Sequence, residues 1–279
     1  MSVYQQVSNS EKWNSVTWRY LKKVPENSTL RCGGQCLRMG NDCKAFAIYS
    51  HNYDYCVLLG GFAQLNHTVW MNPYGGWSVY HELNERLEMP VFRVSAGNGV
   101  SVYNSWLTGA PSSLSETSIS RDLDLSSPLS DFYKHPLVDD WKNWGITEVI
   151  FSLYTNSHEV VRLRFSGSGT SKTSWFSLSN LLSSPWTDLD VNAEVNYFTI
   201  SLENYKDHYR KFYINSHFGG CHVDEGWLLV LDGSDVCSWT FKTAYPTFHY
   251  ALGSQMGRWA DANQIGSADD LVISVLIQM

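Results

Sequence analysis

The second half of the chain alternates short hydrophobic runs with polar, glycine-containing turns, a pattern that predicts half-buried β-strands. The turns include Ser166–Gly169 and Asp232-Gly233, and Asp-Gly is a strong hairpin signal. No helical periodicity interrupts the series. Residues 141–279 are therefore predicted to form an antiparallel β-sandwich of jelly-roll-like form, or a barrel. The predicted strands are Glu148–Tyr154, Val160–Phe165, Tyr197–Leu202, Lys211–Ile214, Trp227–Leu231, Ser238–Phe241, Phe248–Leu252 and Leu271–Ile277.

The first 84 residues predict a separate, small α+β domain. A strand is expected at Val16–Tyr20, and Asn27-Ser28 can cap a helix from about Thr29 to Met39, which Gly40 would end. Three strand-like runs follow, at Lys44–Ser50, Tyr55–Leu59 and Trp77–Leu83. The whole chain is thus predicted to be mainly β, with a helix-on-sheet module at its N-terminal end.

Residues 85–140 differ from both neighbours, because they are rich in serine and broken by prolines. Strand-like runs at Val91–Val94 and Val100–Trp106 remain within them. We therefore expect three segments: a domain at 1–84, a connector with the first strands of the second domain at 85–140, and the β-domain at 141–279.

The composition and the net charge limit the kinds of molecule that the chain is expected to bind. The 279 residues are 43% hydrophobic and 17% charged, enough to bury a core, and the net charge is −7. A negative net charge argues against a non-specific nucleic-acid binder, which needs a basic face, and against a protein held electrostatically at a membrane surface. The sequence holds no apolar run of the length that a transmembrane helix needs, so no membrane insertion is expected.

The cysteines favour an oxidising compartment. There are six, in two local groups, and two N-x-S/T sequons begin at Asn27 and Asn66. Paired cysteines with sequons predict a secreted protein, and since the first residues do not read as a signal peptide, we expect that the signal has been removed. A cytosolic protein with free thiols is the alternative.

The N-terminal cysteines carry a resemblance to a known family. Cys32-x3-Cys36-x6-Cys43-Lys44-Ala45-Phe46, followed by Tyr55-Cys56-Val57-Leu58, resembles a PAN/Apple domain. That resemblance implies bridges Cys32–Cys56 and Cys36–Cys43, and carbohydrate or protein binding. The cysteine pair that joins the termini of many Apple domains is missing, which suggests the shorter PAN form. A zinc site on these cysteines is the competing interpretation.

A looser resemblance covers about residues 147–260. Tyr209–Ile214, Gly226–Val230 and Phe248–Ser254 are similar to strands of the farnesoic acid O-methyltransferase-like domain. The family's name is no evidence of an activity, and its members resemble β-sandwich interaction modules of secreted invertebrate proteins. Cys221 and Cys237 depart from the family pattern, and we expect these two to form a disulfide of their own.

Several residues could form a site. His217, His222 and Asp224 have the donor types for Zn²⁺, against a simple polar loop as the alternative, and Ca²⁺ in an oxygen-rich loop is a further option, although no cofactor is expected. Catalysis, if present, would use His249 or His208 for acid–base work. For ligand binding we expect exposed aromatic residues with polar neighbours, against core packing for any one of them: Trp186, Arg258, Trp259, Asp261, Tyr74 and Trp77.

These observations favour a secreted interaction protein that recognises a glycan or an extracellular protein. The alternative is a cofactor-free enzyme that oxidises or hydrolyses a small aromatic or apolar molecule in a pocket of the β-domain. A structural or adhesive matrix protein is a third option. A binding module predicts exposed loop aromatics and an ordinary histidine pKa, whereas an enzyme predicts a closed pocket with a perturbed one.

Overall fold

We analysed a computed structural model of the chain. It describes residues 87–113, 122–202 and 209–277, with side chains from Glu88 onward. Before residue 87 it describes only the backbone of six strands. The chain divides into two compact units: Met1–Met89 with Leu114–Asp124 and Met279, and Pro90–Ser113 with Leu125–Gln278. We call them unit 1 and unit 2.

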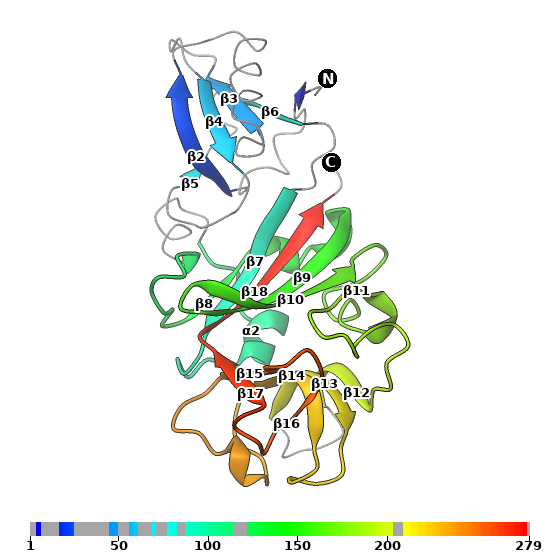
Figure 1. The fold of residues 1–279 in the computed structure, drawn as a ribbon. Helices are drawn as coiled ribbons and strands as arrows, with labels where there is room; N and C mark the ends of the chain where they lie inside the picture. Colours follow the sequence, from blue (N-terminus) through cyan, green and yellow to red (C-terminus); the bar gives the residue numbers. More distant parts are fainter. Residues whose placement is uncertain are drawn as a thin grey trace. The chain divides into compact units, whose positions relative to one another are not determined.

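Unit 1 contains an antiparallel sheet with the strand order β1-β6-β3-β4-β2-β5 (Figure 1). Four of its strands lie where the sequence predicts them. The predicted helix, the sequons and Cys32, Cys36 and Cys43 lie outside the described residues, as does the side chain of Cys56. The strands are β1 (Tyr4–Gln6), β2 (Thr17–Val24), β3 (Ala45–Tyr49), β4 (Cys56–Gly60), β5 (Thr68–Trp70) and β6 (Trp77–Glu82).

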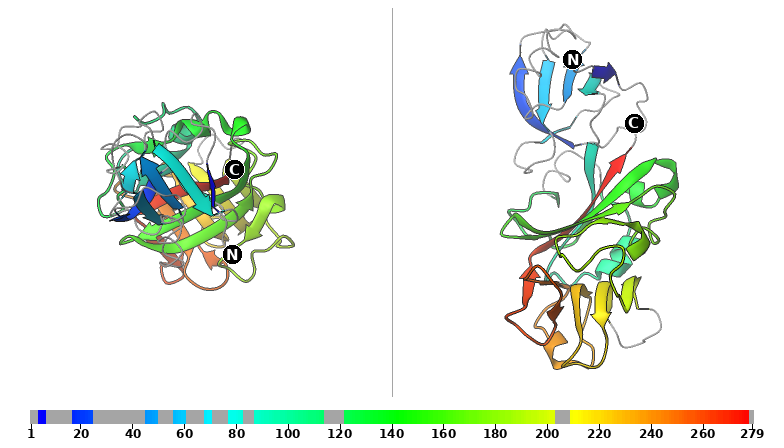
Figure 2. Two further views of the ribbon diagram at one scale, coloured as in Figure 1. Left: turned by 90° about the horizontal axis from the view of Figure 1, so that it is seen from above. Right: turned by 45° about the vertical axis from the view of Figure 1, so that its right-hand side comes forward.

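Unit 2 is built from two antiparallel sheets (Figures 1 and 2). The first, here called the β9 sheet, has the order β11 (Leu181–Ser183), β10 (His158–Ser166), β9 (Ile146–Thr155), β18 (Asp270–Ile277), β7 (Leu87–Ser95) and β8 (Phe132–Lys134). The second, the β14 sheet, has the order β12 (Tyr197–Ser201), β13 (Arg210–His217), β14 (Glu225–Leu231), β15 (Thr247–Ala251) and β17 (Ile265–Ala268), and β16 (Gly257–Arg258) also pairs with β14.

Aromatic side chains fill the space between the two sheets. The rings of Phe151 on β9 and Phe212 on β13 lie 5.5 Å apart, and those of Phe165 on β10 and Phe198 on β12 lie 6.0 Å apart. Trp106 lies 5.3 Å from Phe92 and is fully buried. The prediction of a mainly β chain is confirmed, and unit 2 has the architecture of a β-sandwich.

Two predicted strands are wrong. Val100–Trp106 is the helix α2 (Val102–Leu107), because Ser101 caps it and the Asp232 carboxylate accepts hydrogen bonds from the backbone N–H groups of Val102 and Tyr103 at 2.9 and 3.1 Å. A short apolar run fits either structure, and this long-range cap selects the helix.

Ser238–Phe241 is likewise no strand, because residues 238–240 form a 3₁₀ turn. The Thr240 hydroxyl donates to the Asp235 carboxylate at 3.0 Å and folds the segment back on itself. The described 3₁₀-helices are η4 (Pro136–Val138), η5 (Trp141–Asn143), η6 (Leu178–Asn180) and η7 (Ser238–Thr240). Among the described residues, no helix is both long and apolar enough to cross a membrane.

Candidate ligand-binding site

The outward face of the β14 sheet, turned away from the β9 sheet, carries the site. Strand pairing places Arg210 of β13 opposite Leu231 of β14. It also places Leu229 of β14 opposite His249 of β15, which lies opposite Ser267 of β17. Since paired residues of an antiparallel sheet point to the same side, these strands present one continuous face.

A bulge in β13 decides which side chains reach this face. The register with β14 shifts after Lys211, and Phe212 has a left-handed φ of 39°. Strict alternation would send Arg210 and Tyr213 to opposite faces. With the bulge, Phe212 enters the core and Arg210, Tyr213 and Asn215 share the outward face.

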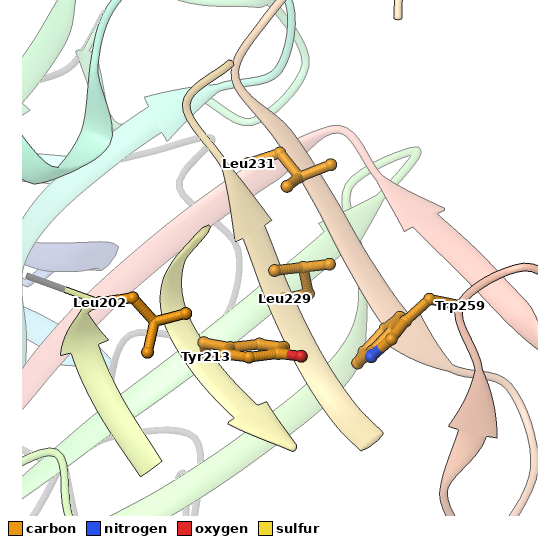
Figure 3. Packing of buried hydrophobic residues seen from close by; sticks show 5 residues of the cluster. All are labelled: Leu202, Tyr213, Leu229, Leu231 and Trp259. Atoms are coloured by element: carbon orange, nitrogen blue, oxygen red, sulfur yellow. The ribbon is translucent and has the colours of Figure 1, made fainter. Parts of the chain in front are cut away.

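Residues of the loops that hold Trp239 and Trp259 pack onto this face. Its buried side chains form a second, smaller hydrophobic core (Figure 3). Trp239, Tyr245 and Ile265 pack against its edge while half-buried. Together these side chains exclude water from the middle of the outward face of the β14 sheet. The buried members are Leu202, Tyr213, Leu229, Leu231 and Trp259.

Arg210 lies beneath these loops as a fully buried cation. Its Nε donates to Asp235 at 2.7 Å, and its Nη1 donates to the Tyr213 hydroxyl at 2.8 Å and to Asp224. The guanidinium carbon lies 4.9 Å from the centre of the Trp239 ring. Burial alone would lower the pKa of Arg210, but Tyr213, Asp224 and Asp235 outweigh it and raise the pKa, so the side chain stays charged.

Asp224 connects this cation to the tryptophan that closes the face. Its Oδ1 accepts hydrogen bonds from the Tyr213 hydroxyl at 3.1 Å and from Asn215 at 2.9 Å. Asn215 in turn accepts a hydrogen bond from the Trp259 indole at 2.7 Å, and the Trp259 backbone N–H donates to the Asp224 carbonyl at 3.0 Å. Asp224, Tyr213, Asn215 and the Trp259 indole thus each have a hydrogen-bond partner inside the protein.

A disulfide ties the two covering loops together. Cys221, between β13 and β14, is bonded to Cys237, between β14 and β15, which confirms the predicted disulfide. The Cys237 backbone N–H donates to Asp235 at 2.8 Å, and the Trp239 indole donates to the Cys221 carbonyl at 2.8 Å. The position of the Trp239 ring therefore depends on both loops.

A pocket of about 200 Å³ opens beside these rings. The planes of Trp239 and Trp259 are inclined by 28°, with centres 6.4 Å apart. The half-buried Trp239 and the exposed Lys242 and Ser267 leave the pocket open to solvent. It is lined by Trp239, Lys242, His249, Trp259, Ala260, Ala262, Ile265 and Ser267.

His249 is the histidine in the wall of this pocket. One ring nitrogen lies 3.1 Å from the Ser267 hydroxyl and the other 3.0 Å from the Thr247 hydroxyl. Burial, helped by the nearby charge of Lys242, lowers the pKa of His249 to about 4. The ring is therefore neutral at pH 7 and can both donate and accept a hydrogen bond.

The expectation that Trp186 and Trp259 are exposed is wrong, since each is only 4% exposed. Both indole N–H groups have partners inside the protein, and the Trp186 indole donates to the Ala251 carbonyl at 3.0 Å. A bonded N–H lets the large apolar ring be buried without leaving a polar group unpaired. Trp259 nevertheless lines the pocket, whereas Trp186 does not.

Arg258 and Asp261 lie close to Trp259 in sequence, but neither of them lines the pocket. The Arg258 side chain is 61% exposed and lies 3.7 Å from Glu225. The Asp261 carboxylate accepts hydrogen bonds from Asn263 and Gln264 at 3.0 and 2.9 Å, so it shapes a turn. Neither side chain joins Trp239 and Trp259 in the wall of the pocket.

The residues considered for a metal do not converge either. His217 and His222 are exposed, whereas Asp224 is buried against Arg210. Within the described part of the chain, no three histidine, cysteine or acidic side chains come together as a metal site would require. His208, Tyr74 and the side chain of Trp77 lie outside the described residues.

Arg210, Lys242 and Ser267 are not among the site residues predicted from the sequence. A charged residue within the apolar strand at 210–214 was a usable signal, because a buried arginine needs carboxylate partners. Lys242 and Ser267 carried no such signal, since they join the pocket only through the packing of loops and a sheet edge.

Comparison of the chain with protein-family models, with curated proteins and with solved structures finds no match.

Proposed function

We propose that this chain is a recognition module whose pocket beside Trp239 and Trp259 binds a single saccharide unit. The observation that carries the proposal is the aromatic pair lining a pocket that also contains Lys242, His249 and Ser267. Indole faces cover the apolar face of a sugar ring with little loss of entropy, and the polar groups bond its hydroxyls.

The rings are held in place before any ligand arrives. The Trp239 indole bonds the Cys221 carbonyl and lies over the Arg210 guanidinium, and the Trp259 indole bonds Asn215. Preorganised side chains lose less freedom on binding, which favours affinity. The indole N–H groups are already used, so the rings offer a ligand only their faces and edges.

The volume of the pocket sets the size of the ligand. At about 200 Å³ it is smaller than the pockets that hold drug-sized molecules. One sugar ring, with about 12 non-hydrogen atoms at about 0.3 kcal/mol each, would then bind in the millimolar range. Tighter recognition would need several copies or several units of one glycan.

The experiment is titration of the purified chain with monosaccharides at millimolar concentration, followed by tryptophan fluorescence and by NMR shifts of indole N–H groups. We expect saturable binding that Trp239→Ala abolishes. Trp144→Ala, which removes another half-buried indole outside this pocket, is the matched control and should bind as the wild type does. Failure of a broad monosaccharide panel to bind the folded protein would overturn the proposal.

Hydrolysis is a second candidate, favoured by the 3.1 Å contact between the Ser267 hydroxyl and His249. Ser267 Oγ would attack an ester carbonyl, and His249 would take its proton and pass it to the leaving alcohol. Water would then attack the acyl-serine, with His249 taking the proton of the water and returning it to Ser267 Oγ as the acid leaves. The pKa of about 4 makes His249 a weak base at neutral pH, so recognition ranks first. A fluorophosphonate probe that labels the wild type but not Ser267→Ala would support hydrolysis, and absence of labelling would exclude it.

We also propose a cellular compartment for the chain and a family for each of its two units. We infer a secreted protein with a PAN-like unit 1 and a farnesoic acid O-methyltransferase-like unit 2. The Cys221–Cys237 disulfide and the β-sandwich architecture support a secreted adhesion or defence module. Expression with a signal sequence, followed by glycan analysis at Asn27 and Asn66, tests it: modification at these sequons is expected, and retention of an unmodified, reduced chain would contradict it.

A further inference from the structure

The pocket lining carries a positive charge and no negative charge. Lys242 supplies a cation, and none of the lining residues carries a carboxylate. This contrasts with the chain as a whole, whose net charge is −7. A ligand that carries a negative charge would therefore meet a local positive site on an otherwise negative protein.

The backbone of Lys242 is fixed while its side chain is exposed. The backbone N–H donates to the Tyr245 hydroxyl at 3.0 Å, and that hydroxyl donates to the Thr240 carbonyl at 2.7 Å. Among the described residues, no carboxylate forms an ion pair with the Lys242 ammonium. The ammonium can therefore pair with a ligand without first breaking an internal salt bridge.

The two carboxylates that hold Arg210 beneath the Trp239 ring are fully bonded inside the protein. Asp235 binds the Arg210 guanidinium through one oxygen and receives the Cys237 N–H and the Thr240 hydroxyl on the other. Asp224 is bonded by Arg210, Tyr213 and Asn215. Both groups are at least 93% buried, so they cannot pair with Lys242 from the pocket side.

We propose that the pocket selects a saccharide that carries a carboxylate, such as a uronic acid. The ring would pack against Trp239 and Trp259, the carboxylate would pair with the Lys242 ammonium, and Ser267 would bond a ring hydroxyl. This inference rests on the proposed function and adds the class of sugar. A cationic ligand is disfavoured, although an aromatic pair could hold one, because Lys242 would repel it.

The test compares matched pairs that differ only at the carboxylate: glucose with glucuronate, galactose with galacturonate, and mannose with mannuronate. Binding to the wild type, Lys242→Gln, Trp239→Ala and Lys142→Gln is measured by NMR at low salt. Lys142 is an exposed lysine outside the pocket and serves as the charge-matched control.

We expect the acid of at least one pair to bind about tenfold more tightly than its neutral partner, as an added charge-assisted contact allows. Lys242→Gln should remove this preference, so that acid and neutral sugars bind equally. Lys142→Gln should keep the preference, and Trp239→Ala should lose the binding of both. Equal binding of acid and neutral sugars to the wild type would overturn this inference and leave the proposed function intact. A preference that survives in Lys242→Gln would overturn the role of Lys242, and no binding of any sugar would overturn both proposals.

Discussion

At the scale of residues, the contacts of Arg210 dominate the outward face of the β14 sheet. One fully buried cation is shared by the carboxylates of Asp224 and Asp235, and it also lies against the Trp239 ring. Breaking a buried pair by removing one partner is costly, because the other partner keeps its desolvation penalty. Stability and pocket geometry therefore depend on the same few atoms.

The first prediction concerns this network. Asp224→Ala should lower the free energy of unfolding by about 3–5 kcal/mol, since it removes a buried carboxylate from Arg210. Arg258→Ala, which breaks only the exposed pair with Glu225, should cost less than about 1 kcal/mol. Urea unfolding of the full chain, followed by tryptophan fluorescence, measures both. Equal losses for the two variants would show that the buried network adds no particular stability.

The second prediction follows from the two buried histidines. Burial lowers the pKa of His249, together with Lys242, and of His135, each to about 4 from an ordinary 6.5. The unfolded chain therefore binds more protons between pH 6.5 and 4, and the stability is lost as the pH falls through this range.

Each histidine contributes up to about 1.4 kcal/mol per pH unit to that slope. His249→Gln should remove the contribution of His249 to this slope and leave the contribution of His135. Unfolding free energies at several pH values between 4 and 6.5 give the slope for the wild type and the variant. An unchanged slope in His249→Gln would show that His249 titrates alike in the folded and unfolded chain.

At the scale of elements, the bulge in β13 and the two covering loops form the site together. The bulge brings Arg210, Tyr213 and Asn215 to one face, and the loops bring Asp224, Asp235 and Trp239 to meet them. The positions of most strands were predictable because short hydrophobic runs between turn residues mark them. The bulge was not, since nothing in the letters at 210–214 marks a residue with φ of 39°.

The third prediction concerns the disulfide between these loops. Replacing both Cys221 and Cys237 by serine should lower the free energy of unfolding by about 3 kcal/mol, because the bond closes a loop of 16 residues in sequence separation. Freeing the Cys221 loop should also release the Trp239 indole from its carbonyl partner and weaken sugar binding. Denaturant unfolding and the NMR titration measure the two effects, and unchanged binding would show that Trp239 does not need this loop.

At the scale of the whole molecule, composition and alternation were enough to predict a mainly β chain with a sandwich in its second half. The pocket was less accessible to prediction, because its walls come from the 239–242 loop, the β15 and β17 strands and the 259–262 loop. Loop tryptophans such as Trp186 were expected at the surface, and their burial depends on carbonyl partners that only the folded chain supplies.

The fourth prediction concerns the redox state of the chain. Alkylation in denaturant without a reductant, followed by mass spectrometry, should leave Cys221 and Cys237 unmodified and joined, as expected for a protein from an oxidising compartment. Complete alkylation of both residues would contradict the disulfide and remove the main support for secretion.

The position of β18 in the β9 sheet has a consequence for folding. Although β18 follows all the other described strands in sequence, it lies between β9 and β7, and Asp270 at its start pairs with Arg93 of β7 across 177 residues. Pairings of such long range make folding slow. On the ribosome, β7 and β9 must wait, each with an unpaired edge, until nearly all of unit 2 has been synthesised. This sheet therefore needs protection from aggregation during synthesis.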